Sequence, residues 1–281
     1  MKWVVETTVF EQEAPALVEE IKKQGHELHL ADGKEIVWGG KPLPSPFDEK
    51  TPIVVRGSIE FCNHVKRNCD WFPGVYMDMT RYNCTEYYPI FGDKLLNDEY
   101  VMLPFGELGR RKEWLYKTLG EADTLFIRPN RGNKIFSGQL VFKENWDKDL
   151  DRLGFYDTPQ DELCVVARPK KLGVECRLIV VRDRIICGTT YKDHDNELME
   201  KPLPIYNEAF IGWANNWFKT TGYIPDTVWS LDITYDKSDG QYKVLEVGAF
   251  SCCGLYGCPP SIIVEEVSKA AEEDWKDIYD G

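Results

Sequence analysis

Two acidic residues in the last third of the chain have the types and spacing that magnesium chemistry requires. Asp232 lies in the apolar run VWSLDITY and Glu246 in YKVLEV, and the turn-forming segment DKSDG separates them. A hairpin closed near Lys237–Gly240 would place the two acids within a residue of cross-strand register. Mg²⁺ is often held by one or two carboxylates plus substrate phosphates. The pattern therefore predicts a metal site, and an ordinary hairpin with two edge-facing acids is the alternative.

Cations and small residues that could bind phosphate precede this hairpin. Arg128 ends the strand-like run TLFIRP, and the loop after it contains Gly132, Lys134 and Gly138. Backbone N–H groups of such a loop can bind phosphates, and a cation adds complementary charge. The loop has neither a Walker A pattern nor G-x-G-x-x-G, so neither common mononucleotide fold is indicated. Surface turns also contain Gly, Asn and Lys, so the loop alone leaves both interpretations open.

Another predicted hairpin carries an acid and a guanidinium on one strand. Glu175 and Arg177 are two residues apart in VECRLIVV, so they share a face of that strand. An acid beside a fixed guanidinium would suit a ribose hydroxyl next to a phosphate oxygen, and a surface salt bridge is the alternative. Lys192 follows the second strand, where it would point into the same cleft or into solvent.

The order of these residues resembles the ATP-grasp superfamily over roughly residues 120–258, and most closely a divergent clade common in phages and in peptide- or metabolite-modifying operons. In that superfamily two α+β lobes grip ATP between them. The resemblance therefore implies an α+β ATP-grasp fold preceded by a small α/β domain, with ATP and Mg²⁺ as cofactors.

The resemblance also implies which residues bind the nucleotide. Arg128 would stand where a phosphate-contacting lysine usually lies, and Lys134 would be a flap cation near Gly138. Glu175 would bind the ribose hydroxyls. The adenine edge would be read by the backbone of Val166, Ala167 and Arg168.

Four further residues are implied in the chemistry and in metal binding. Arg177 and Lys192 would be catalytic, contacting phosphates or an acyl phosphate, and Asp232 and Glu246 would hold Mg²⁺. The usual family ending is Glu-x-Asn, whose Asn supplies a further metal ligand, but this position is Gly248. A water, a backbone carbonyl or the nearby Ser251 would have to substitute.

Three cysteines follow this position, Cys252, Cys253 and Cys258. Their C-C-x₄-C spacing lacks the paired C-x₂-C knuckles of a structural zinc site, so free thiols are the favoured interpretation over zinc. A nucleophilic cysteine would need a partner base, and the spacing assigns none.

Strand and helix patterns define the elements that would position these residues. Residues 1–75 read as a small α/β unit, residues 34–50 as a loop, and residues 76–105 as a connector with one or two short helices. Further helices are predicted at Leu108–Leu119, near Glu144–Leu153, and at Asn207–Thr221 and Pro260–Tyr279. The predicted domains are residues 1–105 and an ATP-grasp domain at 106–281, with lobes at about 120–190 and 191–281.

Composition limits the partners and the compartment. The net charge of −13 argues against broad nucleic-acid binding, and no apolar run approaches the length of a membrane span. The strand-like N-terminus does not resemble a signal peptide, and nine scattered cysteines suggest reduced thiols, so a cytoplasmic location is expected. Nothing in the pattern fixes an oligomeric state.

The expected activity is that of a carboxylate–amine ligase. It would use ATP and Mg²⁺, pass through an acyl phosphate, release ADP and phosphate, and act on small-molecule or peptide substrates. Two alternatives stay open: a nucleotide-binding regulatory module without catalysis, and an ATP-grasp kinase that phosphorylates a hydroxyl.

Overall fold

The computed structural model describes residues 1–43, 51–133, 135–154, 158–196, 202–205 and 208–279. The chain divides into two compact units. Unit 1 comprises Met1–Asp78, Val174–Asp232 and Val247–Gly281, and unit 2 comprises Met79–Gly173 and Ile233–Glu246. Unit 2 is thus inserted into unit 1 at two points of the chain. The predicted domain boundary near residue 105 is a different division and stays a prediction.

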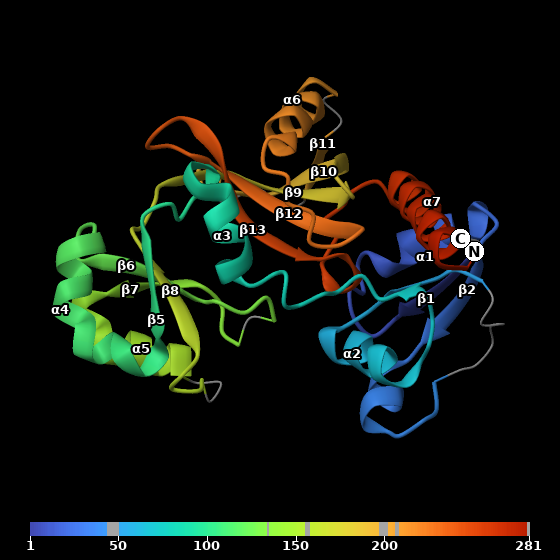
Figure 1. Cartoon of the computed structure of the whole chain (residues 1–281), viewed down its shortest axis with the longest axis horizontal. Coiled ribbons are helices and arrows are strands. Elements are labelled where there is room, and N and C mark those ends of the chain that lie inside the picture. The colour runs from blue at the N-terminus through green and yellow to red at the C-terminus, as the bar shows by residue number, and fades with distance from the viewer. Residues whose placement is uncertain (44–50, 134, 155–157, 197–201, 206–207, 280–281) are drawn as a thin grey trace. The chain divides into compact units, whose positions relative to one another are not determined.

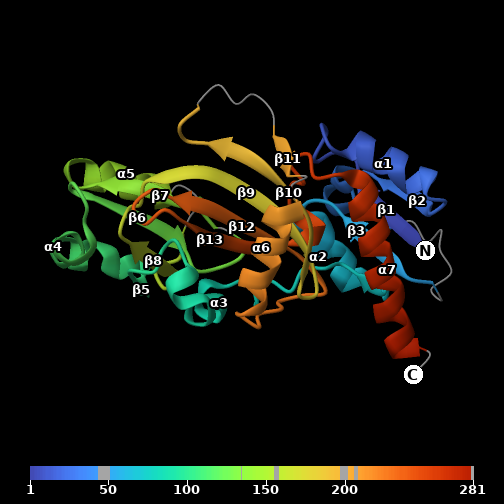
Figure 2. The same ribbon diagram turned by 90° about the horizontal axis from the view of Figure 1, so that it is seen from above.

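Unit 1 contains a parallel sheet with the strand order β2-β1-β3-β4. Its strands are β1 (Lys2–Glu6), β2 (Glu27–Ala31), β3 (Ile53–Arg56) and β4 (Pro73–Gly74). Three helices of unit 1 pack near this sheet, α1 (Ala14–Lys23), α2 (Ile59–Asn68) and α7 (Pro260–Tyr279). Figures 1 and 2 both show α1 and α7 side by side.

Alternation along β1 explains this layering. Trp3 and Val5 are buried in a core with residues of α1 and α7, whereas Val4 is buried in a second core with Phe61 and Val65 of α2. Successive side chains of a strand point to opposite faces of the sheet. Because β1 has apolar residues on both faces, helices must pack against both faces to bury them. The Trp3 Nε1–H also donates to Ser268 Oγ at 3.2 Å, which ties β1 to α7.

A second sheet has the strand order β11-β10-β9-β12-β13. Its strands are β9 (Leu172–Val181), β10 (Arg184–Asp193), β11 (Leu203–Ile205), β12 (Val228–Asp236) and β13 (Gln241–Ala249), and α6 (Glu208–Lys219) precedes β12. Strands β9 and β10 are antiparallel and joined at Arg182–Asp183, as the sequence predicted. The Gly240 N–H donates to Asp236 O at 2.9 Å, which closes the predicted second turn.

Unit 2 contains an antiparallel sheet with the order β5-β8-β6-β7. Its strands are β5 (Tyr100–Pro104), β6 (Thr124–Pro129), β7 (Gln139–Phe142) and β8 (Leu163–Ala167), and its helices are α3 (Cys84–Phe91), α4 (Leu108–Leu119) and α5 (Trp146–Gly154). Leu115 of α4 and Trp146 of α5 share one core with Leu125 and Val141 of the sheet.

The structure departs from the sequence prediction in several short segments, among them strand β4, which was not predicted. The connector predicted at residues 76–105 contains strand β5, and the loop predicted at residues 34–50 begins with a π-helical turn at Lys34–Trp38. Residues 44–50 of that loop lie outside the described residues. Strand β11 was not predicted at all. These segments are short or rich in Gly and Pro, and β5 is a strand because it pairs with the distant β8 (Tyr100↔Ala167).

No helix of the described chain is long and apolar enough to cross a membrane.

Candidate functional site

In unit 1, two of the predicted site residues form a buried ion pair. Arg177 Nε donates to Asp232 Oδ1 at 2.7 Å and Nη2 donates to Oδ2 at 2.6 Å, a bidentate arrangement. Both residues are buried, at 7% and 2% exposure. Burial by itself lowers the pKa of Arg177, but the charge and hydrogen bonds of Asp232 raise it well above its ordinary value. The sequence predicted both residues, but in separate roles.

Two tyrosine rings cover the guanidinium of this pair. The Arg177 guanidinium carbon lies 4.6 Å from the ring centre of Tyr256 and 5.8 Å from that of Tyr191. The two rings stack on each other with centroids 4.7 Å apart. Arg177 Nη1 also donates to the Gly254 carbonyl oxygen at 2.8 Å. Charge, ring stacking and a backbone bond therefore all fix the orientation of this guanidinium.

Glu175 contacts three side chains, two from β10 and one from the residue that follows it. Its Oε2 accepts from the Tyr191 hydroxyl at 2.8 Å, and its Oε1 contacts His194 Nε2 and, at 3.2 Å, Lys192 Nζ. Burial raises the pKa of Glu175, but hydrogen bonds from His194 and Tyr191 and the charge of Lys192 outweigh it and lower that pKa. The sequence predicted Glu175 and Lys192 and missed Tyr191 and His194. Both lie in the continuous polar run TTYKDHDNE, where no spacing distinguishes them from their neighbours.

Gly248, at the position of the usual family Asn, has little space around it. A Cβ built there would lie 2.9 Å from Ser230 Oγ, so any side chain requires Ser230 to move. Ser230 is buried and lies two residues from Asp232 on β12, so it shares the face of that acid. Ser251, one of the three predicted substitutes, uses its hydroxyl to accept from the Tyr76 N–H at 3.0 Å. The hydroxyl beside Gly248 is therefore that of Ser230, which the sequence did not single out.

Unit 2 contains a second arginine–carboxylate contact, which is longer. Arg128 Nη2 lies 3.5 Å from Glu246 Oε2, and Nη1 donates to the Leu245 carbonyl oxygen at 3.3 Å. Arg128 is 6% exposed. The structure thus places the predicted phosphate-binding cation of unit 2 beside one of the two predicted metal ligands.

The predicted flap after β6 is anchored at several described positions. Gly132 N–H donates to Asn83 Oδ1 at 3.2 Å, and Phe136 is buried in the core of unit 2. Gly138 lies over β6, where a Cβ would be 2.7 Å from the Phe126 ring. Lys134, the predicted flap cation, lies outside the described residues. The glycines allow close packing of this loop, and its two ends are fixed.

The predicted adenine-reading residues belong to the middle of a sheet. Strand β8 lies between β5 and β6, and Val166 pairs with residues of both neighbours, as does Ala167. The Arg168 N–H donates to the Glu99 carbonyl oxygen at 3.2 Å, and its Nε donates to Glu99 Oε2 at 2.8 Å. Much of the hydrogen-bonding capacity of this backbone is therefore used within unit 2, and the adenine role stays a prediction.

The donor chemistry fits Mg²⁺. Asp232 and Glu246 supply hard carboxylate oxygens, which are the ligand type that Mg²⁺ prefers. In the described part of the chain, no group of three or more His, Cys, Asp or Glu side chains could hold a metal ion. The roles of Asp232 and Glu246 as ligands of Mg²⁺ stay a prediction.

None of the nine cysteines is in a disulfide, and the interpretation of Cys252, Cys253 and Cys258 as thiols and not zinc ligands stays a prediction. The pKa of Cys258 is raised well above its ordinary value, mainly by a hydrogen bond with Cys187 and secondly by burial. Such a thiol is protonated at neutral pH and a poor nucleophile.

The fold is that of the ATP-grasp enzymes. D-alanine–D-alanine ligase from Bacillus anthracis is similar to the chain with a TM-score of 0.64 and 12% identity, and the match covers 99% of each chain. D-cycloserine synthetase DcsG gives 0.62 at 12% identity over 96% of this chain and 100% of its own. ATP-grasp ligase PsnB in complex with a minimal precursor gives 0.57 at 12% identity over 96% of this chain and 99% of its own.

No protein-family model and no curated protein sequence matches the chain. The structural similarity confirms the predicted α+β ATP-grasp fold. At 12% identity it defines the fold alone.

Proposed function

We propose that the chain is an ATP- and Mg²⁺-dependent ligase that joins a carboxylate to an amine and releases ADP and phosphate. The observation that carries the proposal is the similarity of nearly the whole chain to ATP-grasp ligases, with TM-scores of 0.57 to 0.64. The residues that the family order assigns to phosphate and metal binding support it, because in each unit they include a buried arginine beside a carboxylate.

The proposed reaction has two steps. The substrate carboxylate attacks the γ-phosphorus of ATP, the bond to the β-phosphate oxygen breaks, and ADP leaves. The amine then attacks the carbonyl carbon of the acyl phosphate, loses a proton and displaces inorganic phosphate. Such a transfer needs mainly positioning and charge neutralisation from the protein. Mg²⁺, held by Asp232 and Glu246, would supply part of that neutralising charge.

Lys192 and Arg177 would contribute in different ways. The Lys192 side chain is 56% exposed, and its ammonium is held by a contact with Glu175 that a phosphate could replace. Arg177 is fixed by Asp232, Gly254 and two rings, so it would act as a preorganised charge that needs no reorganisation during the reaction. Glu175 would offer a ribose hydroxyl an acceptor oxygen shared with Tyr191 or His194.

The environment of Gly248 favours a second candidate, a nucleotide-binding module without catalysis. The further metal ligand usual in the family is absent at this position, and Ser230 occupies the space that its side chain would need. A module of this kind would bind ATP without turning it over.

Detection of ADP and of a trapped intermediate tests the proposal. The purified chain is incubated with ATP, Mg²⁺, hydroxylamine and a panel of amino acids, short peptides and dicarboxylic acids. A ligase yields a hydroxamate and ADP with the correct acid, because hydroxylamine intercepts the acyl phosphate. ATP binding by calorimetry with no ADP from any acid supports the binding module, and a phosphorylated alcohol with no hydroxamate supports the kinase.

A matched pair of variants ties the activity to the site. Lys192→Ala should reduce turnover by roughly ten- to a hundred-fold, the loss expected for one charge-assisted phosphate contact. Lys219→Ala removes an exposed lysine of the same unit that has no assigned role, and should turn over like the parent. Equal turnover in both variants would contradict the assignment of Lys192.

A further inference from the structure

The loop of residues 250–258, which follows β13, is held by charged side chains from the first 60 residues. Arg56, at the end of β3, donates from Nη1 to the Phe250 carbonyl oxygen and from Nη2 to that of Cys253, each at 2.6 Å. Its guanidinium also lies 4.7 Å from the Phe250 ring centre and 5.5 Å from that of Phe10. Arg56 is 3% exposed, so it serves this loop and not a solvent-borne ligand.

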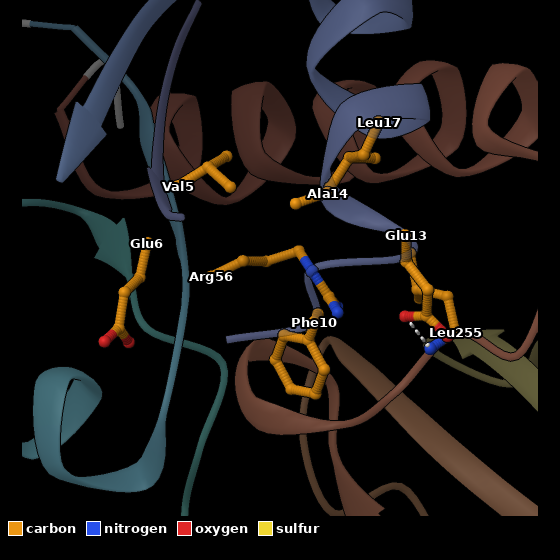
Figure 3. Close-up of a pocket in the computed structure, with 8 residues that line it drawn as sticks. All are labelled: Val5, Glu6, Phe10, Glu13, Ala14, Leu17, Arg56 and Leu255. Carbon is orange, nitrogen blue, oxygen red and sulfur yellow. Dashed lines mark hydrogen bonds between the residues drawn. The ribbon is translucent and has the colours of Figure 1, made fainter. Parts of the chain in front are cut away.

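Glu13 holds the other end of the same loop. Its Oε2 accepts from the Leu255 N–H at 2.7 Å and its Oε1 from the Tyr256 N–H at 2.6 Å. Figure 3 shows the contact with Leu255 and the Arg56 side chain lying over Phe10. Glu13 occupies the N-cap position of α1 but makes no capping hydrogen bond. Its carboxylate binds a segment more than 240 positions away in the sequence instead.

The region between these residues is not a substrate pocket. The cavity lined by Glu6, Phe10, Glu13, Arg56 and Leu255 has a volume of about 10 Å³. That is room for about one water molecule. Arg56, which is buried, and Glu13 bind backbone groups of the loop at 2.6 to 2.7 Å, so they are suited to fixing it.

Tyr256 is the residue whose backbone most needs fixing. Its φ is +49°, in the left-handed region that bulky residues rarely adopt. Such a conformation costs free energy and persists only where the surroundings determine it. It also places the ring of Tyr256 against Arg177 and Tyr191, at 4.6 Å and 4.7 Å. The two N–H groups held by Glu13 belong to this residue and the one before it.

We propose that Glu13 is a positioning residue: by binding the N–H groups of Leu255 and Tyr256 it holds the Tyr256 ring on the guanidinium of Arg177 and so fixes the Arg177–Asp232 pair. The importance of this pair for nucleotide binding rests on the proposed function, but the physical coupling from Glu13 to Arg177 does not.

The coupling is measured on the nucleotide-free protein. Hydrogen exchange reports the amides of residues 254–258, and the Nε–H signal of Arg177 in a ¹⁵N spectrum, assigned by its loss in Arg177→Lys, reports the ion pair. In Glu13→Gln the amide group can accept only one of the two N–H groups. Exchange at Leu255 and Tyr256 should become roughly ten-fold faster, the change expected from losing one charge-assisted bond. The Arg177 signal should shift or broaden.

Three further variants separate positioning from general destabilisation. Glu11→Gln changes an exposed neighbour and should leave both signals as in the parent. Tyr256→Phe keeps the ring and should also keep the parent Arg177 signal, whereas Tyr256→Ala should perturb it as Glu13→Gln does. If Glu13 acts through Tyr256, the double variant Glu13→Gln/Tyr256→Ala should perturb Arg177 no more than Tyr256→Ala alone.

Two results would overturn the proposal. An unchanged Arg177 signal in Glu13→Gln, with faster loop exchange, would limit Glu13 to holding the loop. Equal perturbation of Arg177 by Glu11→Gln would show a non-specific effect. Calorimetry with Mg²⁺ and ATP on the same variants then tests relevance to nucleotide binding. A parent that binds no ATP would reject the proposed function while the two spectroscopic results still decide the positioning role.

Discussion

Each of the two units contains an arginine beside a carboxylate, but the two contacts differ in length and in the number of hydrogen bonds. In unit 1 Asp232 receives two short hydrogen bonds from Arg177, at 2.7 and 2.6 Å. In unit 2 Glu246 lies 3.5 Å from a single nitrogen of Arg128. Charges removed from water are tolerated only when well paired, so the closer pair is expected to be the structural one. The longer contact binds Glu246 less strongly to its arginine than Asp232 is bound to Arg177.

The largest effect is expected from breaking the close pair. Asp232→Asn leaves the guanidinium of Arg177 buried without its counter-charge, which typically costs about 3–5 kcal/mol. Urea denaturation should show this loss in the free energy of unfolding. Asp151→Asn, on an exposed face of α5, is the matched control and should change it by less than about 0.5 kcal/mol. A loss in Asp232→Asn as small as in this control would show that the pair is not structural.

A second variant tests the packing beside Asp232. Gly248→Ala places a Cβ 2.9 Å from Ser230 Oγ, and overpacking of a buried site typically costs about 1–3 kcal/mol. The same substitution in a Ser230→Ala background should cost less, because the atom that it meets has been removed. Thermal denaturation of the two single variants and the double variant gives the coupling between the positions. If the free-energy costs of the two single variants simply add in the double variant, the strain caused by Gly248→Ala does not come from its contact with Ser230.

Glu246→Gln should have a smaller effect on stability, about 0.5–1.5 kcal/mol, because its contact with Arg128 is longer than that between Arg177 and Asp232. If Glu246 is a metal ligand, the same variant should weaken Mg²⁺-dependent ATP binding in calorimetry far more than it lowers the free energy of unfolding. If Glu246→Gln lost as much stability as Asp232→Asn and kept its nucleotide affinity, the Arg128–Glu246 contact would also be structural and Glu246 would not be a metal ligand.

The smallest effect concerns pH and Glu175. The pKa of this carboxyl is lowered in the folded chain from an ordinary value of 4.5, so the folded state binds its proton less readily than the unfolded state does. Its contribution to stability is therefore complete above pH 4.5 and is lost as the pH falls through the lowered pKa. The stability difference between the parent and Glu175→Gln, from urea midpoints between pH 7 and pH 3, should shrink over this acidic range. Glu11→Gln should follow the parent throughout.

Local patterns in the sequence were sufficient to predict most elements. The apolar spacing predicted α4 and α7 with the bounds observed, and the runs TLFIRP and QLVF are β6 and β7. These elements are determined by side chains a few positions apart, which a single sequence displays directly. Strand β5 was missed because its identity as a strand depends on β8, more than 60 positions later.

The contacts within the candidate site were not predictable in the same way. The sequence singled out Arg177 and Asp232, yet their pairing depends on β9 lying next to β12, across 55 positions. Glu13 gave no signal, because an acid before a helix normally acts on that helix. Ser230 was overlooked because only the three-dimensional structure shows that it lies next to Gly248. Spacing alone thus suggests candidate residues, and their partners require the fold.

The tie between Trp3 and Ser268 has a consequence for synthesis of the chain. The core of unit 1 combines β1 and α1 with Ile263, Val264 and Val267 of α7, so β1 is covered by a helix that is made much later: Ser268 follows Trp3 by 265 positions. Domains usually fold as they emerge from the ribosome, N-terminal parts first. Here this part of the apolar face of β1 has no cover from α7 until that helix has been translated. Ribosome-bound fragments of increasing length should therefore acquire protease resistance in unit 1 only when they include α7.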